Sequence, residues 1–113
     1  MTADDRRVLS ELKDRLTVAA SHTLRKLVVF GSRVRGDHAE DSDLDVVALV
    51  ERATPAVIQK MDDAAYDVMW KFDFRPMISL KIFEVEWFDA AVRNRIPFYR
   101  NVVREGVVLG EPW

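Results

Sequence analysis

Apolar and polar residues alternate along the chain in two patterns, one with the period of a helix and one with the period of a strand. Apolar residues recur every three or four positions over residues 4–21, which predicts an amphipathic helix. A second stripe of this kind follows Thr54 and Pro55, a typical helix start, and predicts a helix that ends near Trp70 or Lys71. Each helix should therefore bury one side against a core.

Three stretches have the pattern of β-strands. Residues 24–30 end in an uninterrupted apolar run and residues 44–50 are apolar almost throughout, so both predict buried strands. Residues 77–83 alternate between apolar and polar side chains, which predicts a third strand with one face partly open.

The last third of the chain predicts two short helices over 86–94 and 97–105, the second of which ends at Gly106. Residues 107–109 are expected to form a last short strand or a packed tail. Helices that alternate with strands imply an α/β fold in which helices cover a small β-sheet. At 113 residues the chain has the length of one domain, and we expect a single domain over 1–113.

Composition narrows the class of function. With 17 basic and 19 acidic residues the net charge is −2, so no global basic field draws the chain to nucleic acid or to an anionic membrane. Cysteine is absent, which excludes disulfides, thiolate zinc sites and a cysteine nucleophile. The start of the chain lacks the apolar segment of a signal peptide, and no apolar run is long enough for a membrane span. We expect a soluble, cytoplasmic protein, and a homo-oligomer stays open.

Asp43 and Asp45, at the start of the second strand, are the first candidate site. Carboxylates two positions apart on a strand point to the same face, about 7 Å apart along the backbone. Asp45 precedes an almost wholly apolar run, where an unpaired carboxylate is costly, so a cation partner is expected, and oxygen ligands favour Mg²⁺ or Mn²⁺. The plain alternative is a solvated turn.

The aspartates do not form a calcium loop of the EF-hand type, although Asp41 completes the start of that pattern. The EF-hand loop needs glycine at its sixth position and glutamate at its twelfth. The chain has Val46 and Arg52 there, which excludes this type of site.

Gly31 and Ser32, between a buried strand and the start of a short helix, are the second candidate site. A turn that opens a helix presents free backbone N–H groups to an anion. Arg33 and Arg35 follow, and arginine suits phosphate oxygens. The spacing fits neither the P-loop nor the G-x-G-x-x-G pattern, and most Gly-Ser pairs only turn the chain. Beside the two aspartates, however, this turn indicates a site for a metal–phosphate ligand.

Gly31-Ser32, ten intervening residues and Asp43-x-Asp45 together resemble the signature of the nucleotidyltransferase superfamily that includes DNA polymerase beta. The Phe-Gly-Ser-Arg-x-Arg-Gly and Asp-Ser-Asp-Leu-Asp segments resemble more closely its minimal nucleotidyltransferase (MNT) domains, and residues 97–109 do so too. This resemblance covers essentially the whole chain. It implies a nucleotidyltransferase fold, with a small mixed β-sheet covered by helices.

The resemblance also implies transfer of a nucleoside monophosphate, AMP from ATP, with release of pyrophosphate. It implies that Asp43 and Asp45 are catalytic residues that hold one or two Mg²⁺ (or Mn²⁺) ions. Gly31 and Ser32 would cradle the β- and γ-phosphates, with Arg33 as a supporting cation. Two metal ions about 4 Å apart can clamp the attacking and leaving oxygens of an in-line displacement.

One departure from the superfamily concerns a third carboxylate, which its catalytic members carry on a later strand. The predicted strand over 77–83 has no acidic residue, Asp73 precedes it and Glu84 follows it. We expect Asp73 to serve, if any residue does, and Glu84 to be a surface residue. Without a third acid, a nucleotide-binding site with weak or no transfer activity would remain.

The MNT resemblance implies a partner, a toxin of the HEPN type, which the MNT protein adenylylates as its antitoxin. The alternative is an antitoxin with a vestigial nucleotide site that neutralises its partner by direct binding. Adenylylation of a small molecule such as an antibiotic is disfavoured, because 113 residues leave little room for an acceptor-binding module.

The remaining polar and aromatic residues carry structural expectations. His22 and His38 should be solvated, and Trp70, Trp87 and Trp113 should pack in the core or at an interface. Four arginines are expected on a solvated helix surface, with a basic face as the alternative: Arg93, Arg95, Arg100 and Arg104.

Overall fold

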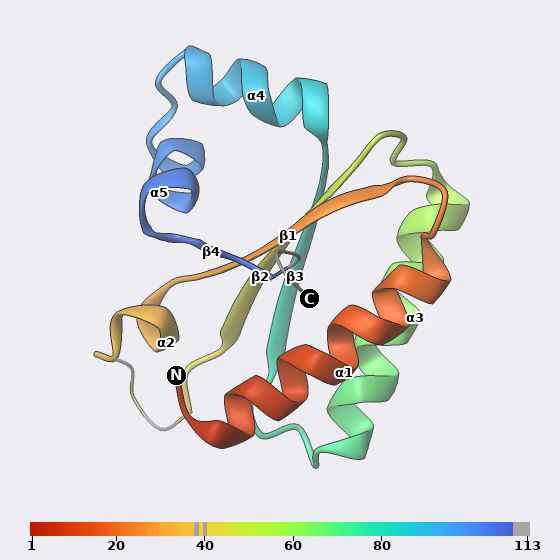
Figure 1. Cartoon of the computed structure of the whole chain (residues 1–113), viewed down its shortest axis with the longest axis vertical. Helices are drawn as coiled ribbons and strands as arrows, with labels where there is room; N and C mark the ends of the chain where they lie inside the picture. The colour runs from red at the N-terminus through yellow and green to blue at the C-terminus, as the bar shows by residue number, and fades with distance from the viewer. Residues whose placement is uncertain (38, 40, 110–113) are drawn as a thin grey trace.

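A four-stranded mixed sheet forms the centre of the computed structural model, which describes residues 1–37, 39 and 41–109 (Figure 1). The strands are β1 (Leu24–Phe30), β2 (Leu44–Val50), β3 (Ile78–Glu84) and β4 (Val107–Val108). Their order in the sheet is β3-β2-β1-β4. β1 runs antiparallel to β2 and β4, whereas β3 runs parallel to β2. The predicted α/β class with a small mixed sheet is confirmed.

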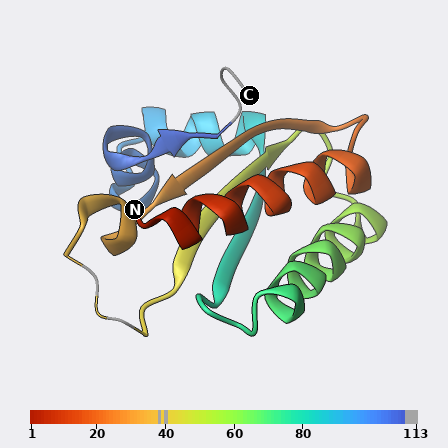
Figure 2. The same ribbon diagram turned by 60° about the horizontal axis from the view of Figure 1, so that its bottom comes forward.

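Helices cover both faces of this sheet (Figures 1 and 2). They are α1 (Ala3–Ala19), α2 (Ser32–Arg35), α3 (Pro55–Lys71), α4 (Val85–Arg93) and α5 (Pro97–Glu105). α1 and α3 lie side by side on one face, and α4 and α5 lie on the other. The predicted elements are all present, with ends that agree to within two residues.

Each face of the sheet has its own apolar layer, because successive strand residues point to opposite faces. Leu12 of α1 and Val46 of β2 belong to the layer under α1 and α3, and both are completely buried. Val47 and Leu49 of β2 belong to the layer under α4 and α5. β2 is apolar from Val46 to Val50 because these residues contribute to both layers.

The starts of α1 and α3 follow from side-chain caps. The backbone N–H of Asp5 donates to the hydroxyl of Thr2 (3.0 Å), and the Thr2 N–H donates to the Asp5 carboxylate (3.3 Å), which together form a capping box. At α3, the hydroxyl of Thr54 accepts from the N–H of Val57 (3.2 Å) ahead of the predicted Pro55 start.

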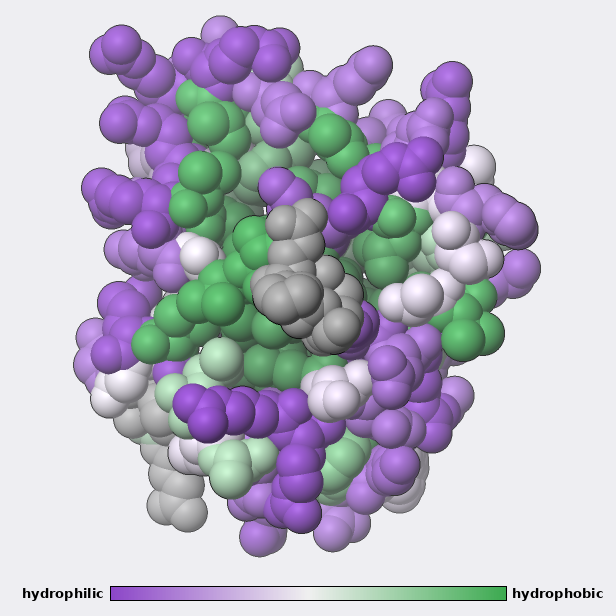
Figure 3. Space-filling view, viewed as in Figure 1, coloured by the Kyte–Doolittle hydropathy of each residue, from purple (hydrophilic) through white to green (hydrophobic). Residues whose placement is uncertain are grey.

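Gly106 ends α5 as predicted, although its backbone is extended (φ −73°, ψ 153°) and does not form the left-handed cap typical of glycine. A β-carbon on Gly106 would lie 2.4 Å from the carbonyl oxygen of Val102 and 2.4 Å from Cγ1 of Val28. Glycine is therefore required here by two contacts, one with the last turn of α5 itself and one with Val28 of β1. Beyond it, Val107 and Val108 of β4 are exposed, and Figure 3 shows apolar side chains gathered near the centre of that side of the molecule.

The tryptophans correct the expectation of core packing. Trp70 is 61% exposed on α3, where its ring meets that of Phe74 edge to face at 5.1 Å. Trp87 on α4 is 50% exposed and stacks on Phe83 at 5.5 Å. Large rings on the outer side of a helix keep aromatic neighbours without reaching the core. Trp113 lies outside the described residues.

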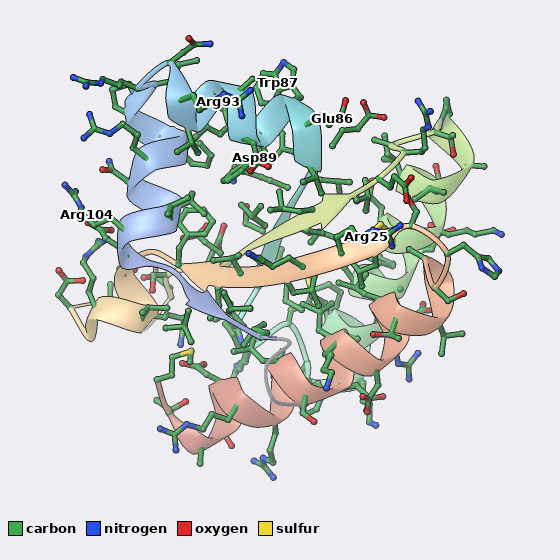
Figure 4. All side chains as sticks on the ribbon, turned by 45° about the horizontal axis from the view of Figure 1, so that its top comes forward. Arg25, Glu86, Trp87, Asp89, Arg93 and Arg104 are labelled. Carbon is green, nitrogen blue, oxygen red and sulfur yellow. The ribbon has the colours of Figure 1, made fainter. Side chains whose placement is uncertain are left out.

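The histidines and the arginines of the last third carried the other surface expectations. His22 is exposed, whereas His38 lies outside the described residues. All four arginines of the last third, Arg93, Arg95, Arg100 and Arg104, are exposed, and Figure 4 shows Arg93 and Arg104 on α4 and α5. Within the described part of the chain, no helix combines the length and the apolar character that a membrane crossing needs.

Candidate functional site

Asp45 is the centre of the candidate site. It lies near the start of β2, opposite Phe30 of β1 and beside Ser79 of β3. Its carboxylate abuts Gly31, since a β-carbon on Gly31 would stand 2.5 Å from Asp45 Oδ2. Gly31 has φ +89° and ψ −163°, a region that only glycine adopts readily. The structure thus brings the glycine of the Gly-Ser turn into contact with the second aspartate.

Burial and three charged neighbours act on the pKa of Asp45. Burial raises the pKa of the Asp45 carboxyl, the ammonium of Lys81 opposes this rise, the carboxylate of Asp43 adds to it, and the guanidinium of Arg35 opposes it. Asp43 is exposed and immediately precedes β2. A half-buried carboxylate beside a second carboxylate is an arrangement that a bound cation would stabilise.

Ser32 is the first residue of α2, so its side chain does not cap this helix. The N-cap is Gly31, whose carbonyl accepts from the N–H groups of Val34 (3.2 Å) and Arg35 (3.2 Å). Among the described residues, no hydrogen bond involves the Ser32 hydroxyl. Ser32 is half-buried next to Gly31 and keeps this hydroxyl available for a ligand.

Arg33 is directed toward α1. Its guanidinium is 7% exposed and lies 3.0 Å from the carboxylate of Asp5, which is 1% exposed. Arg33 Nε also donates to the carbonyl oxygen of Ser42 (2.9 Å). These contacts give Arg33 the structural role of joining α1, α2 and the start of β2. Its predicted role as a cation for phosphate stays a prediction.

Arg35 is the exposed arginine of α2. It donates to the carboxylates of Asp37 and of Glu105, in both cases at 3.3 Å. The second contact joins α2 to the end of α5. Because the guanidinium is open to solvent, these ion pairs contribute little to stability.

β3 adds Ser79 and Lys81, two site residues that the sequence did not identify. Ser79 pairs with Asp45 and Lys81 pairs with Val47 in the parallel register, so both side chains lie on the face of the sheet that carries Asp45. Lys81 Nζ donates to Ser79 Oγ (3.1 Å). The alternation of the strand was visible in the sequence, but its register against β2 was not.

Neither Asp73 nor Glu84, the two candidates for the third carboxylate, joins Asp43 and Asp45 at the site. Asp73 is exposed in the turn after α3, with φ +56°. Glu84 lies at the opposite end of β3, where it accepts from the N–H of Ala53 (2.9 Å) and is half-buried. Across the described residues, no group of three Asp, Glu or His side chains is placed to hold a metal ion. Asp43 and Asp45 carry the hard oxygen ligands that Mg²⁺ prefers, so these are the residues that would hold such an ion.

Comparison with known proteins identifies a matching family and two similar proteins. The family model described as "Nucleotidyltransferase domain" matches residues 6–106. Two proteins of Methanocaldococcus jannaschii, both named "Putative protein adenylyltransferase", are similar to the chain. The first is 32% identical over 85 residues, which is 73% of this chain and 86% of the relative. The second is 26% identical over 106 residues, which is 94% of this chain and 98% of the relative.

The fold also resembles a solved structure. The crystal structure of a protein from Sulfolobus solfataricus, described as a "putative nucleotidyltransferase", superposes with a TM-score of 0.52. The match covers 92% of this chain and 80% of that chain at 18% sequence identity. At this level of identity the likeness supports the fold alone.

Proposed function

Because the chain belongs to the nucleotidyltransferase domain family, we propose that it transfers AMP from ATP to a protein acceptor. The observation that carries this proposal is the contact of Gly31 with Asp45, which joins the Gly-Ser turn to the aspartate pair. The names of the two archaeal relatives support AMP as the transferred group and a protein as its acceptor.

Asp43 and Asp45 are proposed to hold one Mg²⁺ (or Mn²⁺), which when bound would neutralise part of the triphosphate charge. Gly31 and Ser32 would bind phosphate oxygens through main-chain N–H groups and the Ser32 hydroxyl. In the reaction, a hydroxyl oxygen of the acceptor forms a bond to the α-phosphorus of ATP. The bond from this phosphorus to the bridging oxygen breaks, pyrophosphate leaves, and the hydroxyl proton passes to solvent. The chain's own contribution is position and charge.

The acceptor is proposed to be a HEPN-type toxin encoded beside this protein, which would make the chain its antitoxin. This part of the proposal rests on the resemblance of the Gly31–Asp45 region and of residues 97–109 to MNT domains. Adenylylation of the toxin would then be the means of neutralisation.

A second candidate function is neutralisation by binding alone, with a nucleotide site that transfers nothing. It is favoured by one observation. Among the described residues no third acid joins Asp43 and Asp45, and the neighbouring positions on β3 are Ser79 and Lys81.

Label transfer separates the two functions. ATP labelled at the α-phosphate is incubated with Mg²⁺, the co-encoded partner and either the wild type or the Asp43→Asn plus Asp45→Asn variant. The proposal expects label on the partner with the wild type and none with the variant. Asp14→Asn plus Asp62→Asn, which removes two exposed carboxylates of α1 and α3, is the matched control and should retain transfer. Absence of transfer by the wild type, with neutralisation retained by the site variant, would establish binding alone.

A further inference from the structure

Lys81 stands out on the face of the sheet that carries Asp45. The residue is half-buried, and among the described residues no carboxylate lies within 4.0 Å of its ammonium. The carboxylate of Asp45 attracts this ammonium, but among the described residues no carboxylate pairs with it directly, so its charge is available to an anionic ligand. Lys60 on α3, by contrast, is exposed.

The ammonium of Lys81 is oriented toward Asp45. Lys81 lies two residues along β3 from Ser79, and its Nζ turns back to donate to Ser79 Oγ at 3.1 Å. Ser79 is the direct neighbour of Asp45 across the strands, which are about 4.8 Å apart. The hydrogen bond uses one of three ammonium donors, so two remain for a ligand.

The balance of charge at the site indicates which kind of ligand Lys81 would bind. Asp43 and Asp45 carry two negative charges, which a single divalent cation balances. A nucleoside triphosphate adds up to four more, and a compact, strongly hydrated ammonium is a common phosphate binder in proteins. A second divalent cation beside Lys81 would meet repulsion from the ammonium and would lack a third carboxylate among the described residues.

We propose that Lys81 is a nucleotide-binding residue whose ammonium, oriented by Ser79, binds a phosphate oxygen of the triphosphate in the place of a second divalent cation. The site then holds one divalent cation for each bound nucleotide. This inference rests on the proposed nucleotide site, and it adds the number of metal ions and a specific phosphate contact.

Binding of a non-hydrolysable analogue tests the inference without any need for transfer. Adenosine 5′-(α,β-methylene)triphosphate is titrated in the presence of Mn²⁺, and bound Mn²⁺ is counted by electron paramagnetic resonance. Wild type should bind one Mn²⁺ per chain in the ternary complex. Lys81→Met should weaken analogue binding roughly 10- to 100-fold, the range for a lost charged hydrogen bond, while Mn²⁺ alone binds as well as before or better. Lys81→Glu should admit a second Mn²⁺.

Controls separate this inference from the proposed function. Lys60→Met should leave analogue binding unchanged, and Lys81→Gln replaces Lys81→Met if the latter does not fold. Two Mn²⁺ ions in the wild-type complex, or analogue binding unchanged by Lys81→Met, would overturn the inference, even where Asp45→Asn abolishes binding and so upholds the nucleotide site. A wild type that binds no analogue would instead refute the proposed function itself.

Discussion

Gly31 lies so close to Asp45 that a single β-carbon on it would stand 2.5 Å from the carboxylate oxygen Oδ2. The glycine that turns the chain out of β1 thus also contacts the carboxylate of the aspartate site. Any side chain on Gly31 must displace the acid, and this couples the two halves of the candidate site by contact.

Gly31→Ala should therefore damage both the fold and the site. Its backbone lies at φ +89° and ψ −163°, where a β-carbon is strained by about 1–3 kcal/mol before the clash with Asp45 is added. We expect urea denaturation to show a loss of free energy of unfolding of at least this size. Mn²⁺ binding to the folded variant should fall at least tenfold.

Gly36→Ala is the matched control, because Gly36 also has positive φ (+85°), but a β-carbon added to it would meet no atom within 4 Å. It should lose about 1–2 kcal/mol of stability through backbone strain and keep its Mn²⁺ affinity. Equal metal binding by the two alanine variants would contradict the coupling of Gly31 to Asp45.

Asp45→Asn should make the metal-free protein more stable at neutral pH while it abolishes metal binding. Because burial raises the pKa of the Asp45 carboxyl, the folded state holds this proton more tightly than the unfolded state. The stability from this group is complete below its ordinary pKa of 3.8 and is lost as the pH rises through the raised value. Asparagine does not ionise and avoids that loss.

Urea unfolding of the metal-free protein at low and at neutral pH measures this effect. The advantage of Asp45→Asn over the wild type should be larger at neutral pH, and no more than about 1 kcal/mol, since the carboxyl is partly solvated. Asp43→Asn, at an exposed position, should change the free energy of unfolding by no more than about 0.5 kcal/mol. A variant less stable than the wild type at neutral pH would contradict the prediction.

The ion pair between Asp5 and Arg33 should be the most sensitive polar contact of the fold. Both side chains are at least nine-tenths buried, and their charged atoms lie 3.0 Å apart. Arg33→Met leaves the Asp5 carboxylate buried without its partner, which should cost about 3–5 kcal/mol in urea denaturation. The exposed pair of Arg25 and Glu51 is the control, and Arg25→Met should cost less than about 1 kcal/mol.

A second substitution tests whether the loss comes from the uncompensated charge. Asp5→Asn added to Arg33→Met should recover part of the stability, because the amide of asparagine can be buried at lower cost than a carboxylate. If the stability losses of Arg33→Met and of Asp5→Asn, each measured alone, instead add up in the double variant, the pair does not act through charge.

How much of the fold and of the site the sequence could reveal depends on how far apart along the chain the contacting residues lie. The strand of Asp45 and the turn of Gly31 were predictable, because local periodicity and one short motif define them. The place of Lys81 beside Asp45 was not, since it depends on the register between β2 and β3, two strands that α3 separates in the chain. The partner of Arg33 lies 28 positions away in the chain, so an arginine whose position in the motif suggests a phosphate ligand is bound to Asp5.

Gly106→Ala tests the contact between α5 and β1. The new β-carbon would lie 2.4 Å from the carbonyl oxygen of Val102, in α5 itself, and 2.4 Å from Cγ1 of Val28 on β1, so the last turn of α5 must distort and residue 106 must move away from β1. Such overpacking should cost about 1–3 kcal/mol in urea denaturation, and amide hydrogen exchange should rise at β4, which pairs with β1 at Val28. Val103→Ala, at a position of α5 that is 60% exposed, should change the free energy of unfolding by no more than about 0.5 kcal/mol. If Gly106→Ala were as mild as this control, α5 would have room to adjust, and the glycine would not be required by the packing.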